Sequence, residues 1–151
     1  RSRWKITALG GGHGLHASLK ALRLLDADLT AIVTVADDGG SSGRLREEMD
    51  IIAPGDLRNC LVALADKDTA LEQLFQYRFG GEGELSGHSL GNLFLAALIK
   101  EFGNAQNALE AASTVLNIRG GRYIRSDSSC RFNYSGTGKL VHQCFARFAC
   151  T

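Results

Sequence analysis

The 151-residue sequence has one proline, one methionine and one tryptophan, and its formal net charge at pH 7 is only +1. No run approaches the roughly 18 apolar residues that a membrane span needs. The small net charge argues against a nucleic-acid-binding surface, and a hydrophobic content of 44% argues against disorder. We therefore expect a folded cytoplasmic protein with no membrane span and no nucleic-acid partner.

Motifs for metal and hydrolase chemistry are also missing. The four cysteines form no Cys-x-x-Cys pair, and Cys60 lies in an apolar helical run where a buried free thiol is expected. There is no His-Cys metal pattern and no Gly-x-Ser-x-Gly elbow, which disfavours a zinc site and a hydrolase triad. His13 and His16 belong to no such pattern, so a structural role is expected for both.

The first half of the sequence has the pattern of a parallel α/β protein. Residues 6–9 form a short β-favouring run, and leucines recur at helical spacing after the glycines of residues 10–14. Residues 29–36 are nearly all apolar and rich in β-branched side chains, as in a strand covered on both faces. These segments predict a β-α-β unit, followed by a loop over residues 37–44. Further helices are predicted over residues 57–65, 70–79, 89–102 and 105–116.

A cluster of glycines separates the first predicted strand from the first helix. Gly10, Gly11, Gly12 and Gly14 allow the backbone to approach a ligand closely, and the N-terminus of the following helix would favour an anion such as phosphate. The dinucleotide pattern is incomplete, because Leu15 stands where its third glycine would be. The cluster is therefore consistent with phosphate binding or with a plain tight turn.

The predicted loop after the second strand is rich in polar groups. Asp37 and Asp38 could accept hydrogen bonds from a ribose or bind Mg²⁺ through a diphosphate. Ser41, Ser42 and Arg44 offer hydroxyls and a guanidinium to phosphate. The structural alternative is that one acid caps a turn while the other is solvated. The sequence favours binding.

Two short motifs place polar side chains at the starts of helices. In the Pro-Gly-Asp-Leu-Arg-Asn motif, Asp56, Arg58 and Asn59 lie within one turn and could border a cleft, although Asp56 would also serve as an N-cap. In the Gly-His-Ser-Leu-Gly-Asn motif, His88 and Asn92 are four residues apart and so share a helix face. Either motif could contact a ligand or only stabilise its helix.

Taken together, these motifs resemble those of the YvcK-like gluconeogenesis factors. The matching strings lie at residues 10–15, 33–46, 54–59, 77–79 and 87–93, and Ala-Asp-Asp-Gly-Gly-Ser-Ser-Gly-Arg at 36–44 is the most specific. That family shares its fold with 2-phospho-L-lactate transferase, an enzyme of deazaflavin coenzyme synthesis. The resemblance implies a Rossmann-like, doubly wound parallel sheet with helices on both faces.

The resemblance also implies a ligand and a role. The ligand would be a nucleotide sugar of the UDP-N-acetylglucosamine type, or a nucleotide diphosphate, bound without a cofactor by a protein that supports cell shape and wall synthesis during gluconeogenic growth. The alternative is a phosphotransferase that uses Mg²⁺ at Asp37 and Asp38. A second copy of the chain is a further candidate partner. The ligand-binding residues implied are Gly11, Gly12, Gly14, Asp37, Asp38, Ser41, Ser42, Arg44, Asp56, Arg58, Asn59, His88 and Asn92.

The resemblance covers about residues 4–121. From residue 122 to residue 151 the sequence is basic, rich in cysteine and without apolar periodicity. We therefore expect residues 1–121 to form the nucleotide-binding portion and residues 122–151 to be an atypical tail that adds nothing to the sheet. An out-of-frame or truncated ending, with the C-terminal half of the fold missing, would explain such a tail.

Overall fold

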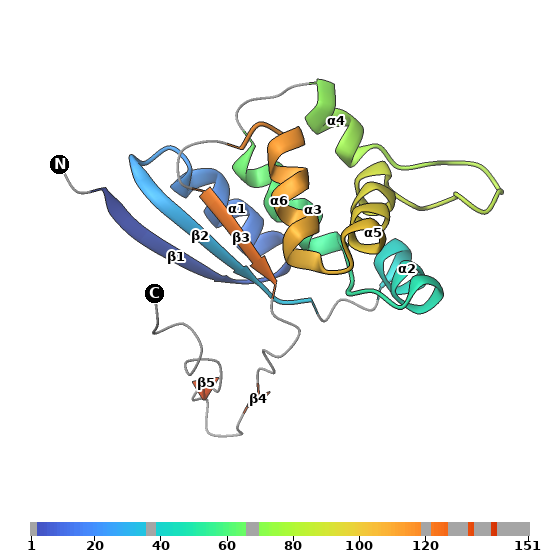
Figure 1. Ribbon diagram of the computed structural model, residues 1–151, viewed down its shortest axis with the longest axis horizontal. Helices are drawn as coiled ribbons and strands as arrows, with labels where there is room; N and C mark the ends of the chain where they lie inside the picture. The colour runs from blue at the N-terminus through green and yellow to red at the C-terminus, as the bar shows by residue number, and fades with distance from the viewer. Residues whose placement is uncertain are drawn as a thin grey trace.

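The computed structural model describes residues 3–35, 39–65, 70–118, 122–126, 133–134 and 140–141, and shows an α/β arrangement (Figure 1). The elements in chain order are β1 (Trp4–Gly10), α1 (Gly12–Leu22), β2 (Ala27–Val33), α2 (Gly40–Met49), α3 (Gly55–Leu64), α4 (Ala70–Gln76), α5 (Leu90–Phe102), α6 (Ala105–Val115), β3 (Arg122–Ser126), β4 (Asn133–Tyr134) and β5 (Leu140–Val141).

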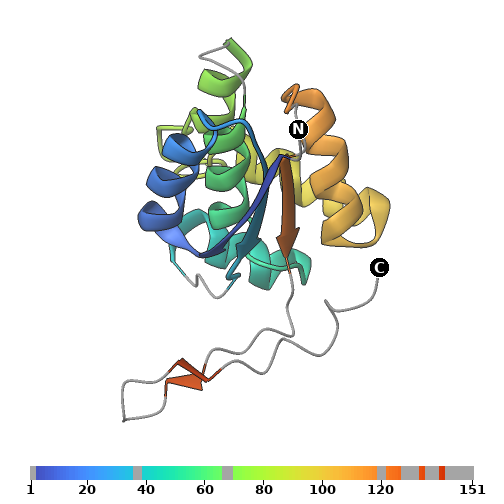
Figure 2. The same cartoon turned by 90° about the vertical axis from the view of Figure 1, so that its left-hand side faces the viewer.

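The main sheet is parallel, with the strand order β1-β2-β3. In its register Ala8 lies opposite Ala31, which in turn lies opposite Ile124. In Figure 2, α1 and α3 lie to one side of the strands and α6 lies next to β3, and buried side chains of all three helices belong to one core with Leu29 and Ile124. The predicted β-α-β unit and parallel α/β fold are confirmed. The short strands β4 and β5 pair with each other in an antiparallel manner.

The strand β2 is buried on one face only. Its buried residues Ala27, Leu29, Ala31 and Val33 alternate with partly exposed ones. The sequence predicted a strand covered on both faces, because its β-branched residues occupy both sets of positions. In the structure the buried set faces the core, and the other set faces outward beside the exposed side chains of β1.

The strand β3 corrects the expectation that residues from 122 onward add nothing to the sheet. Residues Arg122–Ser126 pair in parallel with Leu29–Val33 of β2, and Ile124 is 4% exposed within the main core. A strand of five residues needs only one buried side chain when the neighbouring strand fixes its position, so its apolar pattern is too short to detect. The boundary proposed at residue 121 therefore falls immediately before a strand of the sheet.

The helix α3 forms the centre of the core. It contacts α1, α5, β2 and β3, and Leu57, Leu61 and Leu64 are completely buried. Burial of each leucine stabilises the fold by about 1.5–3 kcal/mol. The apolar run at residues 57–65 therefore belongs to a helix that is surrounded on most sides, and its first turn is held rigidly.

The helix α2 occupies a segment that the sequence analysis assigned largely to a loop. Glycine and serine fill only its first turn, where helical hydrogen bonding is least demanding, and Arg44 to Met49 are mostly good helix formers. The helix ends at Asp50, which has a left-handed backbone with φ of 49°. The predicted helices of the second half are confirmed as α5 and α6, and Gly103 ends α5 with φ of 72°.

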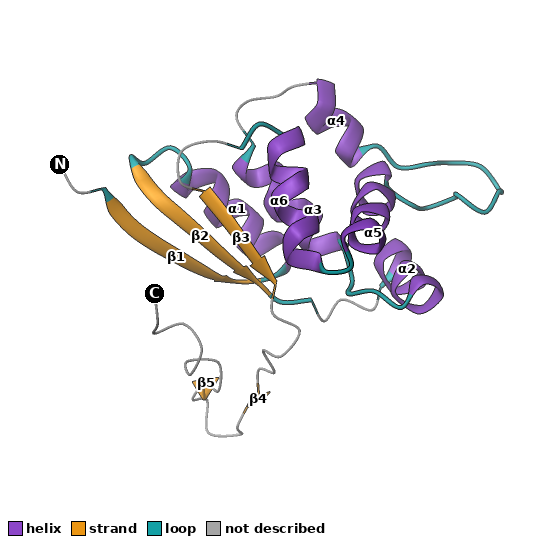
Figure 3. Ribbon diagram, viewed as in Figure 1, coloured by secondary structure: helices purple, strands orange, loops and turns teal. Residues whose placement is uncertain are grey.

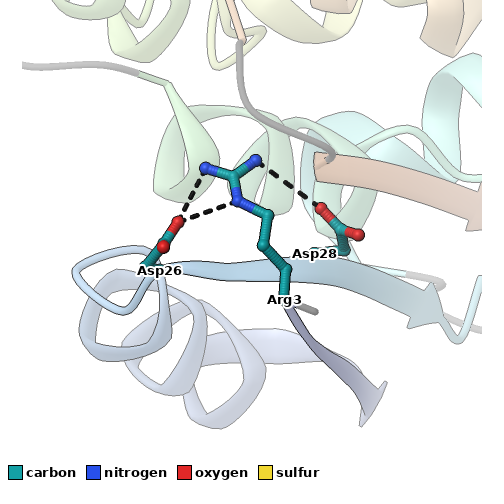
Figure 4. Close-up of polar contacts among 3 residues, drawn as sticks. All are labelled: Arg3, Asp26 and Asp28. Carbon is teal, nitrogen blue, oxygen red and sulfur yellow. Dashed lines mark hydrogen bonds and ion pairs between the residues drawn. The ribbon is translucent and has the colours of Figure 1, made fainter. Parts of the chain in front are cut away.

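A surface cluster joins the beginnings of the first two strands (Figure 4). The Arg3 guanidinium contacts the Asp26 carboxylate at 2.7 Å and lies 3.8 Å from that of Asp28. All three side chains are substantially exposed, so each pair contributes at most about 1 kcal/mol. The cluster lies at the amino ends of the strands, away from the ends that α1 and α2 follow.

In the part of the chain that the structure describes, every helix is too short or too polar to cross a membrane.

The buried thiol of α3 gives the first prediction. Cys60 is 1% exposed, and burial, with a smaller effect of Asp56, raises the pKa of its thiol to about 12. Because the thiolate is the reactive form, Cys60 should not react with Ellman's reagent at pH 8 in the folded protein. The measurement uses a variant in which the other cysteines are serine, with and without urea. In a cysteine-free background, Ser18→Cys on the exposed face of α1 should react at once; equally fast labelling of folded Cys60 would contradict the burial.

Candidate functional site

A cleft of about 730 Å³ lies where α1, α2 and α3 begin. In the chain, α1 follows the carboxyl end of β1 and α2 follows that of β2 (Figure 3). Gly12 of α1, Ser41 and Ser42 of α2 and Asp56 of α3 line it. This volume is within the range of small-molecule sites. The carboxyl ends of parallel strands are also where ligands bind in open α/β sheets.

The three helices that begin at the cleft have no side-chain caps. Their N-cap residues are Gly11, Gly39 and Pro54, and none accepts a hydrogen bond from the first turn through its side chain. By contrast, side chains cap α5 and α6. Ser89 Oγ accepts from the backbone N–H of Asn92, and Asn104 Oδ1 accepts from the backbone N–H of Asn107. Each uncapped N-terminus carries a partial positive charge and backbone donors. Their convergence makes the cleft suitable for an anion.

Most of the residues predicted from the sequence meet at the cleft. The ones that line it are Gly12, Ser41, Ser42, Asp56, Arg58, Asn59 and Asn92. They come from four different sequence motifs, so the fold brings together what the sequence could only suggest separately.

Gly11 is not a lining residue, but it lies against two that are, Thr34 and Asp56, and a side chain would not fit there. A Cβ atom there would come within 2.8 Å of Asp56 Oδ2 and closer still to Thr34 Oγ1. Gly14 is neither a lining residue nor close to other groups. Asp56 lies inside the first turn of α3 and does not cap it, in contrast to the N-cap role predicted for it. Its carboxylate is therefore directed to the cleft instead of to its own helix.

Two of the predicted polar residues that the structure describes, Arg44 and His88, do not line the cleft. Arg44 is exposed, and its guanidinium donates to the backbone oxygen of Ser86 at 2.6 Å. His88 is 4% exposed and reaches the cleft only through Ser41. Both positions are set by the segment between α4 and α5, which extends outward in Figure 1. The backbone N–H of Phe79 donates to the His88 oxygen and that of Gly87 donates to the Phe79 oxygen, which closes this segment. Arg44 fixes this segment and His88 belongs to it.

Ser41, His88 and Asn92 form a buried hydrogen-bond network. The Ser41 hydroxyl lies 2.9 Å from His88 Nδ1 and accepts from the Asn92 amide at 3.0 Å. Because its oxygen accepts from Asn92, its proton can be donated to His88. Burial lowers the pKa of His88, Arg44 acts in the same direction and Glu48 opposes them, so the neutral imidazole that can accept this proton is favoured. The network fixes the hydroxyl at the start of α2.

Arg58 links α3 to α5 through a largely buried guanidinium. It donates to Ser89 Oγ, the cap of α5, and to Asn59 Oδ1 at 2.9 Å. Burial lowers its pKa, Arg78 adds to this effect and Asp56 opposes it. Gly91 makes the arrangement possible, because a Cβ there would lie 2.8 Å from Arg58 Cδ and 2.6 Å from the Phe75 backbone oxygen.

Two buried atoms of cleft residues have no hydrogen-bond partner within the described part of the chain. They are the donor Nε of Arg58 and the acceptor Oδ1 of Asn92, whose residues are 7% and 2% exposed. An unsatisfied buried polar group costs about 1–3 kcal/mol. An acceptor placed at Arg58 Nε and a donor placed at Asn92 Oδ1 would remove this cost.

Sequence reasoning missed several residues of the cleft. Arg78 lines it and lay within the Tyr-Arg-Phe string of the family resemblance, but received no role. His13 and His16 line it from α1, although a structural role was expected for both. Their three-residue spacing after the glycine turn places them on one helix face, and that was the available signal. Thr34, Gln76 and the backbone of Gly39, Gly40 and Gly55 complete the walls.

The predicted metal residues cannot be placed. Asp37 and Asp38 lie outside the residues that the structure describes. Among the described residues there is no group of three His, Cys, Asp or Glu side chains suited to a metal ion.

Open parallel α/β sheets with a cleft at the carboxyl ends of their strands form a large structural class, and the described part of this chain has that arrangement. Within this class, the family model described as 2-phospho-L-lactate transferase CofD matches residues 6–143. The chain belongs to this family. The match continues past residue 121, where the sequence motifs had suggested that the resemblance ends.

The relatives within the family are gluconeogenesis factors. The chain is 47% identical to the gluconeogenesis factor of Listeria monocytogenes over 139 residues, which are 91% of this chain and 43% of that protein. It is 54% identical to that of Bacillus subtilis over 116 residues, 77% of this chain and 37% of that protein. A crystal structure of a UPF0052 family member from Bacillus halodurans is similar with a TM-score of 0.73 and 51% identity, covering 82% of this chain and 39% of that one. The chain thus spans less than half the length of these relatives.

The glycine turn gives a matched pair of substitutions. Gly11→Ala places a Cβ against Thr34 and Asp56, and we expect it to lower the free energy of unfolding by about 1–3 kcal/mol. Gly14→Ala adds the same atom in open space within α1 and should raise the free energy of unfolding by up to about 1 kcal/mol. Urea denaturation measures both. Equal effects of the two substitutions would contradict the close approach at Gly11.

The buried network gives a prediction about pH. Because the pKa of His88 is lowered in the folded protein, the unfolded state binds more protons below about pH 6.5, and stability should fall as the pH falls from about 7 to 5. His88→Asn removes this titration, so its free energy of unfolding should change less over the same range. Ser18→Ala, at an exposed position of α1, removes no titratable group and should keep the wild-type slope. Parallel slopes for all three proteins in urea denaturation would argue against a buried neutral His88.

Proposed function

We propose that this chain binds a nucleoside diphosphate sugar, of the UDP-N-acetylglucosamine type, in the cleft. The observation that carries the proposal is the convergence of three uncapped helix N-termini, those of α1, α2 and α3, on one volume. Two adjacent phosphates would lie against these N-termini, and the hydroxyl of Ser42 would donate to a phosphate oxygen.

Two arginines add charge to the same volume. Arg58 forms part of the floor and keeps a buried Nε–H without a partner in the described structure. Arg78 enters from the segment before α5 and donates one N–H to the Gly87 backbone oxygen, which orients its guanidinium. A diphosphate would be held by charge-assisted hydrogen bonds from both, each stronger than a neutral one.

In this proposal the protein is a binding protein of the cytoplasm and not an enzyme. As in the gluconeogenesis factors that it resembles, nucleotide-sugar binding would support cell shape and cell-wall synthesis during growth on gluconeogenic carbon sources. Binding would require no cofactor.

A second candidate function is phosphoryl transfer with Mg²⁺. The description of the matching family model, 2-phospho-L-lactate transferase CofD, favours it. The metal would depend on Asp37 and Asp38, and transfer would need a second substrate pocket beside the cleft. Dependence of binding on Mg²⁺ would favour this candidate over a cofactor-free binding protein.

Binding tests the proposal directly. UDP-N-acetylglucosamine at millimolar concentration should raise the melting temperature of the chain, because a ligand that binds only the folded state stabilises it by mass action. Arg78→Ala should weaken this binding by roughly 1.5–3 kcal/mol in isothermal titration, the range for a charged hydrogen bond.

Lys100→Ala provides the control, since it removes one positive charge from the last turn of α5 at an exposed site outside the cleft. It should bind as the wild type does. If no nucleotide sugar or nucleoside diphosphate shifts the melting temperature of the wild type, the proposed function is wrong.

A further inference from the structure

His16 presents a hydrogen-bond acceptor to the cleft. Its Nδ1 atom lies 2.9 Å from the backbone oxygen of Asn59. A carbonyl oxygen can only accept, so Nδ1 must carry the proton. In the neutral ring the other nitrogen, Nε2, is then an acceptor, and within the described part of the chain it has no hydrogen-bond partner. Because His16 also lines the cleft, this acceptor is available to a ligand.

The wall that carries His16 differs in chemistry from the rest of the cleft. It is formed by α1 and the start of α3; besides His16, its ionisable groups are His13, Asp56 and Arg58, and of these the Asp56 carboxylate is also an acceptor. The α2 wall instead offers serine hydroxyls and the N–H groups of a helix N-terminus. A phosphate oxygen brings no proton to His16 Nε2 or to the Asp56 carboxylate, so these two acceptors suit a part of the ligand other than its phosphates. A group with protons to donate belongs beside His16.

The side chain of Asn92 is a second, independent indication that the ligand has protons to donate. Its Oδ1 atom is a buried acceptor without a partner among the described residues, on the side of the cleft formed by α2 and α5. A diphosphate alone would leave this atom unsatisfied. Two separate acceptors in one cleft indicate a ligand that bears hydroxyls as well as phosphates.

We propose that His16 is a specificity-determining residue whose Nε2 accepts a hydrogen bond from a ligand hydroxyl. This inference rests on the proposed function, and the hydroxyl can come from the ribose or from the attached sugar. The hydrogen bond from Nδ1 to the Asn59 carbonyl fixes the orientation of the ring. Selection of the ligand then depends on Nε2 as a hydrogen-bond acceptor.

The test compares three probes by isothermal titration of the full chain: pyrophosphate, UDP and UDP-N-acetylglucosamine. His16→Phe removes the acceptor and should weaken the hydroxyl-bearing probes by about 3- to 10-fold, as expected for one neutral hydrogen bond, with pyrophosphate unchanged. His16→Gln can donate to the Asn59 carbonyl and still offer an oxygen, so it should restore binding. Lys20→Ala, at an exposed position of the same helix, should bind every probe as the wild type does.

Melting temperatures of the free proteins show whether each variant is folded. If phenylalanine lowers that temperature markedly, His16→Lys replaces it, because lysine donates but cannot accept. Selective weakening of UDP-N-acetylglucosamine places the hydroxyl on the sugar, and weakening of UDP as well places it on the ribose. Equal effects on all three probes, or on none, overturn the assignment of His16. Failure of the wild type to bind either nucleotide instead overturns the proposed function, and this inference with it.

Discussion

The buried guanidinium of Arg58 is the interaction on which the cleft depends. Removal of a cation from water is unfavourable, and burial accordingly lowers the pKa of Arg58. Hydrogen bonds to Ser89 and Asn59 offset that cost. Because Ser89 also caps α5, one side chain connects the central helix to the helix that supplies Asn92. A change at Arg58 would therefore move both walls of the cleft, in addition to removing a charge from its floor.

The central helix α3 borders two environments of opposite polarity, the apolar core and the polar cleft. Leu57, Leu61 and Leu64 anchor α3 in apolar surroundings, whereas its first turn opens into a polar volume beside two other positive helix ends. Convergence of like partial charges is unfavourable without an anion. The leucines hold the N-terminus of α3 in this position, so the energy of the core maintains an electrostatic arrangement that a ligand would relieve.

The sequence predicted the parts of the structure that have local patterns. The β-α-β unit and the helices α5 and α6 follow from apolar periodicity, and most predicted polar residues do line the cleft. The start of α2 was taken for a loop because glycine and serine signal turns whether or not a helix follows. Arg44 was expected at the phosphate because it follows the serines, but the helix rotates it toward Ser86.

Long-range contacts account for what the sequence could not show. The side chain of Ile124 is buried in the core, and β3 is recognised as a strand by its pairing with β2. The role of His16 depends on a carbonyl that lies 43 residues further along the chain. Arg78 reaches the cleft because the segment between α4 and α5 folds back on itself. None of these contacts leaves a periodic trace in the sequence.

The place of β3 in the chain has a consequence for synthesis. All five helices from α2 to α6 lie between β2 and its neighbour in the sheet. On the ribosome, β2 would therefore keep one unpaired edge while these helices are made, and pairing would have to wait for almost the last described elements. An open strand edge is a template for association with other chains. Early packing of α3 against β2 would shield the apolar face during this interval but leave the backbone edge exposed.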